Sequence, residues 1–160
     1  MSRLFYFLDD QYFIDFSYPE IMQNKAPING AQHKRPCFWA YEDQNTGLMW
    51  LIPISSQIVK YRNIYNKKVS TYGKCDTIVF GKVLGQKRVF LIQNIIPSTQ
   101  KYIANTYVDK QTQIPVQIAA NKEREIIQKV QKVFALVRHK GMRYLVYPDI
   151  LEIEKALLNN

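Results

Sequence analysis

The apolar run Leu48-Met-Trp-Leu-Ile-Pro-Ile-Ser-Ser56 follows directly on the turn-rich segment Asp43-Gln-Asn-Thr-Gly47. A short apolar run that is bounded by turn residues is typical of a strand. A second run of similar character, over residues 35–42, precedes the turn. The sequence therefore predicts a β-hairpin with strands over 35–42 and 48–54.

Further elements are expected on both sides of this hairpin. Towards the N-terminus we predict a strand over 4–8, a short helix from Asp9 or Asp10 to about Phe16, and a loop over 17–34. Towards the C-terminus we predict a helix that Ser55 or Ser56 caps and that carries Ile58, Tyr61 and Tyr65. A hairpin over 77–84 and 87–93, with its turn at Gly85-Gln86, is expected next. An apolar segment over 94–97 and a short strand over 114–118 follow.

The clearest helical pattern covers residues 119–140. One face carries Ile126, Ile127, Val130, Val133, Phe134 and Val137, and Gly141 is a natural end. Pro148 opens a last helix over 149–158. Antiparallel strands followed by helices predict an α+β fold. A chain of 160 residues without a linker predicts a single domain over 1–160.

The charge of the chain is unevenly distributed. Lys and Arg number 22 against 13 Asp and Glu, and ten of the bases but only two of the acids lie within 54–110. Tyrosine and phenylalanine residues alternate with these bases. Because bases bind phosphates and aromatic faces stack unpaired bases, this segment favours nucleic-acid binding over a merely solvated surface. The candidate contacts are Arg62, Lys67, Lys68, Lys74, Lys82, Lys87 and Arg88.

Several classes of protein are excluded by composition and motifs. A hydrophobic content of 47% excludes a disordered chain, and no apolar run approaches the ~20 residues of a membrane span. Acidic residues near the N-terminus argue against a signal peptide, so we expect a cytoplasmic protein. Two cysteines make neither a disulfide framework nor a zinc site. Phosphate-loop, zinc-protease and hydrolase motifs are missing, and the few acids are scattered. We therefore expect no metal or cofactor, so that any nuclease activity is metal-independent.

Metal-independent RNA cleavage needs a proton acceptor for the 2′-OH, cations for the phosphate and a proton donor for the leaving oxygen. Two clusters offer such groups. The first is His33-Lys34-Arg35-Pro36, which is otherwise a solvated basic loop. The second is Pro53-Ile54-Ser55-Ser56 followed by Lys60, in which two ordinary capping serines are the alternative interpretation. Hydroxyls and free N–H groups at a helix N-terminus favour an anion site.

These residues resemble a known family. Lys34-Arg35-Pro36-Cys37-Phe38, Trp50-Leu51-Ile52-Pro53-Ile54-Ser55-Ser56 and Gln93-Asn94-Ile95-Ile96-Pro97 occur in the order and spacing of motifs in the endoribonuclease toxins of type III toxin–antitoxin systems, the ToxN, CptN, TenpN and AbiQ group. The first strand and helix, the long helix and the short last helix are also similar. The resemblance covers most of the chain.

The resemblance implies a compact, twisted antiparallel β-sheet or barrel core of the PemK/MazF-like type with added helices. It also implies a sequence-preferring endoribonuclease that leaves a 2′,3′-cyclic phosphate and a 5′-OH on its mRNA substrate. The partner would be an RNA antitoxin, a pseudoknot derived from a tandem repeat, in a closed hetero-oligomer that RNA bridges. A role in phage defence would follow.

By position, the resemblance assigns Ser55 and Ser56 to the hydroxyl pair and Arg35, or Lys34 beside it, to the basic residue before the first core strand. Members that carry a lysine two positions after the second hydroxyl differ here, because Ile58 occupies that position and Lys60 is the first lysine. Ser56 and Lys60 are four apart and would share one face of a helix. His33 is a further candidate acid or base.

Tyr6 and Tyr12 either line the same cleft or simply pack. Two alternatives stay open beside the type III toxin. A PemK/MazF-like type II toxin with a protein antitoxin would have the same fold and chemistry. A non-catalytic RNA-binding module would use the same basic, aromatic surface.

Overall fold

The computed structural model describes residues 3–23, 25–28 and 31–159, with only the backbone described for 25–28 and 31–33. The strands are β1 (Phe5–Leu8), β2 (Lys25–Ile28), β3 (Ala31–His33), β4 (Cys37–Glu42), β5 (Met49–Ser55), β6 (Ile78–Val83), β7 (Gln86–Leu91), β8 (Ile96–Ser98) and β9 (Ile103–Thr106). The α-helices are α1 (Asp10–Asp15), α2 (Ile58–Tyr72), α3 (Ala120–Lys140) and α4 (Ile150–Leu158). Short 3₁₀ turns are η1 (Ile92–Asn94), η2 (Gln100–Tyr102) and η3 (Arg143–Leu145).

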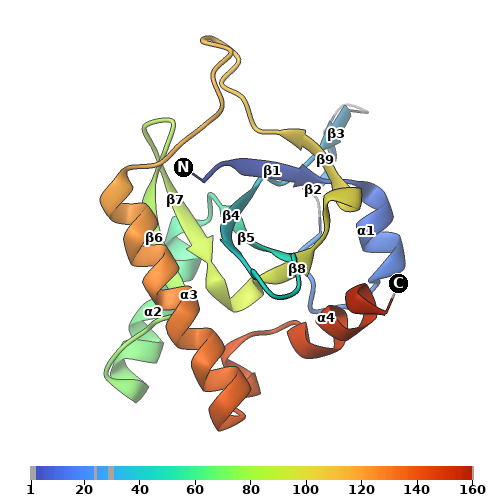
Figure 1. Ribbon diagram of the computed structural model, residues 1–160. Coiled ribbons are helices and arrows are strands. Elements are labelled where there is room, and N and C mark those ends of the chain that lie inside the picture. The colour runs from blue at the N-terminus through green and yellow to red at the C-terminus, as the bar shows by residue number, and fades with distance from the viewer. Residues whose placement is uncertain (1–2, 24, 29–30, 160) are drawn as a thin grey trace.

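An antiparallel sheet is the centre of the fold (Figure 1). In the described part of the chain it has seven strands in the order β6-β7-β5-β4-β1-β9, with β8 paired to β5 outside this path. The α+β fold with a twisted antiparallel sheet is therefore confirmed. Barrel describes this sheet only loosely, because β6 and β9 are the two ends of the described sheet and are not paired with each other.

Strand β5 organises this sheet. One edge pairs with β4, and the other edge pairs first with β8 through Met49, Trp50 and Leu51, then with β7 through Ile54 and Ser55. η1 separates β7 from β8 along that edge. All of β5 is buried.

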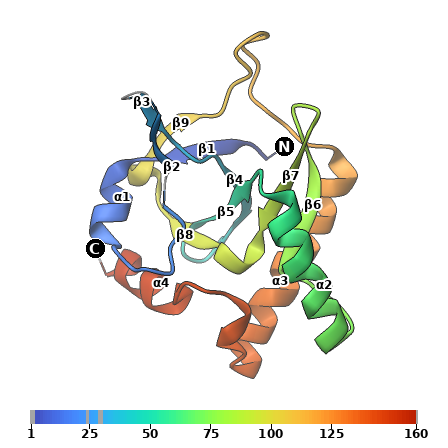
Figure 2. The same cartoon turned by 180° about the vertical axis from the view of Figure 1, so that it is seen from behind.

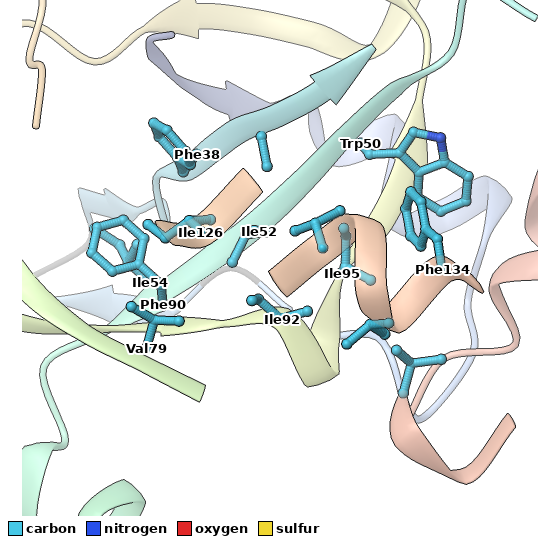
Figure 3. Close-up of a cluster of buried hydrophobic side chains, with 14 of the residues drawn as sticks. Phe38, Trp50, Ile52, Ile54, Val79, Phe90, Ile92, Ile95, Ile126 and Phe134 are labelled. Carbon is cyan, nitrogen blue, oxygen red and sulfur yellow. The ribbon is translucent and has the colours of Figure 1, made fainter. Parts of the chain in front are cut away.

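The two faces of β5 belong to two different cores. Trp50, Ile52 and Ile54 point to a core that α3 covers with its residues Ile126 and Phe134 (Figure 3). Leu51, which points the other way, packs in a core that α1 and α4 cover. The helices therefore lie on opposite sides of the sheet, and the strand that ends at the serine pair is held from both.

Three of the helices agree closely with their sequence patterns. The Asp9 carboxylate caps α1 by accepting from the Gln11 N–H at 2.8 Å. α3 ends at Gly141 in the left-handed conformation, with φ of +67°. Asp149 caps α4 by accepting from the Glu152 N–H at 3.2 Å, so the last helix begins one residue later than predicted.

The fourth helix, α2, departs from the expectation that a serine caps it. Its N-cap is Gln57, which makes no side-chain capping bond, and its residues begin at Ile58. Ser55 instead belongs to β5 and accepts a hydrogen bond from the Gln57 N–H at 3.1 Å. The turn between strand and helix is thus one or two residues longer than the capping pattern indicates.

The sequence patterns fail in three short segments. The predicted loop over 17–34 contains the β2–β3 pair, and β9, which pairs with β1, was not predicted at all. The predicted strand over 114–118 is wrong, because among the described residues this segment makes only an isolated bridge between Val108 and Pro115. The proline ring removes the N–H that a continuing ladder would need.

The β6–β7 hairpin is confirmed, with its tight turn at Leu84-Gly85 rather than Gly85-Gln86. Both residues have positive φ, +52° and +74°, as two-residue hairpin turns of the favoured twist require. This turn and the long loop between β9 and α3 project from the same end of the molecule in Figures 1 and 2. In the described residues, no helix has both the length and the apolar character to cross a bilayer.

Candidate active site

A cleft of about 570 Å³ opens at this end of the molecule. It lies between the end of β5, the segment that leads into β4, the β6–β7 turn and the start of the β9–α3 loop. The polar and charged residues that line it are Lys34, Ser55, Ser56, Gln86, Arg88, Asn105, Tyr107 and Lys110, and the apolar ones are Phe7, Pro36, Ile54, Val83 and Leu84. We call this the serine cleft.

The serine pair differs in exposure. Ser55 is only 2% exposed, and its Oγ accepts the Gln57 N–H. Ser56 is exposed, and its carbonyl oxygen accepts the Ile58 N–H at 2.9 Å. Two of the backbone N–H groups expected to be free for an anion are therefore occupied. Of the two hydroxyls, that of Ser56 is the more accessible to a ligand.

Lys34 and Arg35 lie on different sides of the chain that enters β4. Lys34 lines the serine cleft. The Arg35 Nη1 donates to the Ile54 carbonyl oxygen at 2.8 Å, its Nε donates to the Gln23 carbonyl oxygen at 3.4 Å, and burial lowers the pKa of its guanidinium. Of the two residues that the sequence left open, Lys34 reaches the cleft, and Arg35 holds the end of the strand that carries the serines.

The serine cleft is electropositive. Lys34, Arg88 and Lys110 line it, and among the described residues of its lining none is acidic. Lys110, Asn105 and Tyr107 were not predicted as site residues. The only sequence signal for Lys110 is its place in the basic segment, and no sequence pattern predicts β9. No pattern therefore brings these three residues to the serine cleft.

Lys60 does not join this constellation in the described structure. Lys60 is exposed on α2, with its ammonium 5.2 Å from the centre of the Tyr61 ring, and it is outside the cleft lining. Ser56 and Lys60 do not share a helical face as expected, because Ser56 precedes the N-cap of α2. The His33 backbone ends β3, but its side chain lies outside the described residues.

A second groove of about 360 Å³ adjoins the serine cleft, and Arg88 lines both. Arg62, Lys82 and Lys87 are among its other lining residues. The Arg62 guanidinium lies over the Phe80 ring, 3.7 Å from its centre. The predicted combination of bases and aromatic rings is therefore present on the outer face of the β6–β7 hairpin, directly beside the cleft.

The remaining RNA-contact candidates have other surroundings. Lys67 is exposed on α2, whereas the Lys68 ammonium donates to Thr77 Oγ1 and Gln93 Oε1, both at 2.9 Å. Lys74 lies 3.9 Å from the Asp76 carboxylate. All three lie outside the linings of the cleft and its neighbouring groove.

The two tyrosine candidates pack rather than line the serine cleft. The Tyr6 ring meets the edge of Trp39 at 5.8 Å between ring centres. Tyr12 is fully buried and donates to the Pro97 carbonyl oxygen at 2.8 Å, which agrees with packing and not with lining the cleft. A side chain without exposed surface has no face on which a base can stack.

Neither cysteine offers a reactive group. Cys37 and Cys75 are both buried and free, and burial raises the pKa of the Cys37 thiol to about 12. Within the described residues, no three histidine, cysteine, aspartate or glutamate side chains are grouped so as to hold a metal ion.

The protein is therefore a curved antiparallel sheet with added helices, and its serine cleft gathers hydroxyl groups and cations at one end of the sheet. Comparison with protein-family models and with curated proteins finds no match. Among solved structures, the chain is similar to AbiQ, a lactococcal anti-phage endoribonuclease that belongs to the type III toxin–antitoxin system. The TM-score is 0.71 and the identity 15%, over 98% of this chain and 96% of AbiQ. The fold implied by the sequence motifs is thus confirmed.

Proposed function

We propose that this protein is an endoribonuclease that cuts RNA in the serine cleft. The observation that supports this most is the composition of the cleft: an exposed serine hydroxyl, a buried one and three cations face one cavity whose described lining carries no acid. Such a surface attracts a phosphodiester and repels no part of it. The fold shared with the endoribonuclease AbiQ over nearly the whole chain favours the same class of activity.

The proposed reaction is an internal transesterification. The 2′-oxygen of one nucleotide forms a bond to the adjacent phosphorus, and the bond from phosphorus to the 5′-oxygen of the next nucleotide breaks. The proton of the 2′-OH leaves to an acceptor, and a proton is returned to the departing 5′-oxygen. The products are a 2′,3′-cyclic phosphate and a 5′-OH, so no water is consumed.

The cleft residues then have distinct roles. Lys34, Arg88 and Lys110 neutralise the negative charge that develops on the phosphate oxygens, because preorganised cations act most strongly where charge increases during the reaction. The Ser56 hydroxyl hydrogen-bonds to the reacting phosphate or to the 2′-OH. The buried Ser55 holds the turn before α2 through its bond from the Gln57 N–H. His33 is retained as the candidate for proton transfer.

The regulation that we propose is that of a type III toxin. A tandem-repeat RNA antitoxin with a pseudoknot fold binds the basic surface around the cleft, blocks access of mRNA and bridges toxin copies in a closed hetero-oligomer. The groove of Arg62, Lys82, Lys87 and Arg88 extends the positive surface away from the serines, as a structured RNA partner would need. Sequence preference in cleavage and a cytoplasmic, anti-phage role belong to the same proposal.

The test is cleavage of purified RNA in the presence of EDTA, followed by analysis of the new ends. We expect fragments whose 5′ ends accept a kinase label without prior dephosphorylation and whose 3′ ends carry a cyclic phosphate. Ser56→Ala should abolish cleavage, and Ser70→Ala, which removes an exposed hydroxyl from the far part of α2, should not. RNA that is bound but stays intact would favour the non-catalytic module and overturn the proposal.

A second experiment tests the partner. Transcripts of a tandem repeat adjacent to the gene should suppress both toxicity and cleavage when added in stoichiometric amounts. Suppression by a small protein encoded beside the gene would instead indicate the type II alternative.

A further inference from the structure

A cavity of about 390 Å³ lies away from the serine cleft, between the second half of α2, the segment before β6, α3 and η3. Its lining shares no residue with that of the cleft. The volume falls within the ~300–1,000 Å³ that is usual for small-molecule sites. We call it the tyrosine cavity, after Tyr72, Tyr144 and Tyr147 in its lining.

The three tyrosines are unusually accessible. Tyr72 of α2 is 64% exposed, Tyr144 of η3 is 63% exposed, and Tyr147 is 50% exposed. Single exposed apolar side chains are common, whereas several around one hollow mark an interaction site. The inner wall is apolar and comes largely from α3 and the segment after it, through Val133, Leu136, Met142 and Leu145. A flat aromatic ligand suits such a surface.

Lys68 supplies a hydrogen-bond donor to this cavity. Its ammonium donates to Thr77 Oγ1 and Gln93 Oε1, and in the described part of the chain these are its polar partners, both neutral. Burial lowers the pKa of Lys68. An ammonium has three N–H donors, so one remains for an acceptor on a ligand, and an ammonium itself accepts none.

The lining of the same cavity also holds a hydrogen-bond acceptor. The Asp76 carboxylate, also in the lining, lies 3.0 Å from Lys132 Nζ and 3.9 Å from Lys74 Nζ. The surroundings therefore carry three lysines against one aspartate, an excess of positive charge that favours a ligand attached to phosphates. A second copy of this basic chain would bring like charge to the same place.

We infer that the tyrosine cavity binds an unpaired keto base, guanine or uracil, of an RNA strand. The base stacks on the tyrosine rings, its carbonyl oxygen accepts from Lys68, its ring N–H faces the carboxylate of Asp76, and the flanking phosphates lie near Lys74 and Lys132. Single-stranded RNA is commonly recognised in this way, by aromatic stacking and by hydrogen bonds to base edges. The inference rests on the proposed function only in taking RNA as the ligand, since the site needs no cleavage.

The experiment uses the full-length protein and ten-residue 2′-O-methyl oligonucleotides, which lack the 2′-OH needed for cleavage. Wild-type protein should bind the uridine oligomer more tightly than the adenosine oligomer. A single 5-iodouracil in the strand should cross-link on irradiation to Tyr72, Tyr144 or Tyr147. Tyr144→Ala should weaken binding by about tenfold, as expected for the loss of one stacking face. Tyr18→Ala, which removes a tyrosine of 37% exposure outside the cavity, should leave binding unchanged.

Lys68→Met should reduce the preference for uridine over adenosine. This change also removes a donor from Thr77 and Gln93, so Lys68→Met could fail to fold. In that case Tyr144→Ala, which changes an exposed side chain, provides the test of the base site. Cross-links confined to Tyr107 of the serine cleft, or equal affinity for the two oligomers, would overturn the inference. Self-association of the protein that Tyr144→Ala abolishes would also overturn it, since the cavity would then be a protein interface.

The outcome is separable from that of the proposed function. Cross-linking to the cavity without any cleavage would support the base site and reject the nuclease. Cleavage without cross-linking to the cavity would support the nuclease and reject the base site.

Discussion

The Arg35 guanidinium donates a 2.8 Å hydrogen bond to the carbonyl oxygen of Ile54, the residue directly before the serine pair. Arg35 also lies close enough to Tyr61 of α2 for its charge to oppose the increase in the tyrosine pKa that burial causes. One side chain thus connects the entrance of β4, the end of β5 and the start of α2. The position of the serines depends on it, although Arg35 is outside the cleft lining.

Replacing Arg35 by alanine should reduce both stability and activity. The Ile54 oxygen loses a charged donor, which costs about 1–3 kcal/mol of unfolding free energy, and the end of β5 becomes less rigid. Lys34→Ala, at the neighbouring position, should leave the unfolding free energy within about 0.5 kcal/mol of wild type and still lower cleavage at least tenfold. Urea denaturation and initial cleavage rates measure the two effects. Equal stability of the two variants would contradict the structure.

The two serines should respond differently to alanine. Ser55→Ala removes the acceptor of the Gln57 N–H and should destabilise the protein by about 1 kcal/mol, with a moderate loss of activity. Ser56→Ala should leave stability unchanged and lose activity almost completely. Thermal denaturation and RNA cleavage on the same preparations separate the two roles. The proposed assignment fails if Ser55→Ala is the inactive but fully stable variant.

Charge reversal at Lys110 should weaken RNA binding without unfolding the protein, because this exposed lysine lies in the loop opposite the serines. The slope of log affinity against log salt concentration should also fall by about 1, as fewer counterions are released. Lys140→Glu, the same change at the exposed end of α3, is the control. An identical loss in both variants would mean that only net charge matters.

The Tyr102 hydroxyl donates to the Asp15 carboxylate at 2.7 Å, and this bond is the main reason why the pKa of Asp15 is lowered. Because the folded state holds this carboxylate ionised more strongly than the unfolded state does, the bond stabilises the protein above the ordinary aspartate pKa of about 4. That contribution disappears as the pH falls through the lowered pKa of the folded state.

Tyr102→Phe should therefore unfold at lower urea concentration than wild type at pH 7, and the difference should shrink towards pH 2. In an Asp15→Asn background, the pH-dependent part of the difference should vanish. A gap of constant size at all pH values would mean that the tyrosine acts through packing alone.

Arg138 connects α3 to α4 by two hydrogen bonds to the Glu154 carboxylate, of 2.9 and 2.8 Å, and its guanidinium lies 5.7 Å from the centre of the Trp50 ring. Arg138→Lys cannot reproduce the paired geometry and should cost about 0.5–1.5 kcal/mol. Arg143→Lys is the matched control, because Arg143 lies 4.0 Å from Asp149 and both side chains are largely exposed. Chemical denaturation of the two variants provides the comparison, and equal losses would contradict the role of geometry.

The elements that the sequence predicts well are those whose own residues carry the signal. The apolar run of β5 and the helical spacing of Ile126, Val130 and Val137 in α3 identify these elements without knowledge of their neighbours. β9 is different, since none of its four residues is buried and it forms by pairing with β1, almost a hundred positions away. A sequence pattern within a short stretch of residues does not include a pairing strand that lies so far away in the chain.

The residues of the serine cleft likewise differ in whether the sequence predicts them. The serines and Lys34 belong to motifs that can be read along the chain, whereas Asn105, Tyr107 and Lys110 reach the cleft because β9 folds back beside β1. Lys60 was misplaced for a related reason. Its spacing from Ser56 is helical only if the helix includes Ser56, and a bond between Ser55 and the Gln57 N–H delays the start of α2.

Both faces of β5 are buried, and this restricts which residues around the cleft can change during evolution. The strand that delivers the serines has no face on which substitutions are harmless, since each side belongs to a different core. The opposite wall of the cleft comes from the β9–α3 loop and the β6–β7 turn, where residues such as Leu84 and Lys110 are exposed. Under the proposed function, selection can therefore alter which RNA is accepted by changing one wall, while the wall that carries the serines is inherited almost intact.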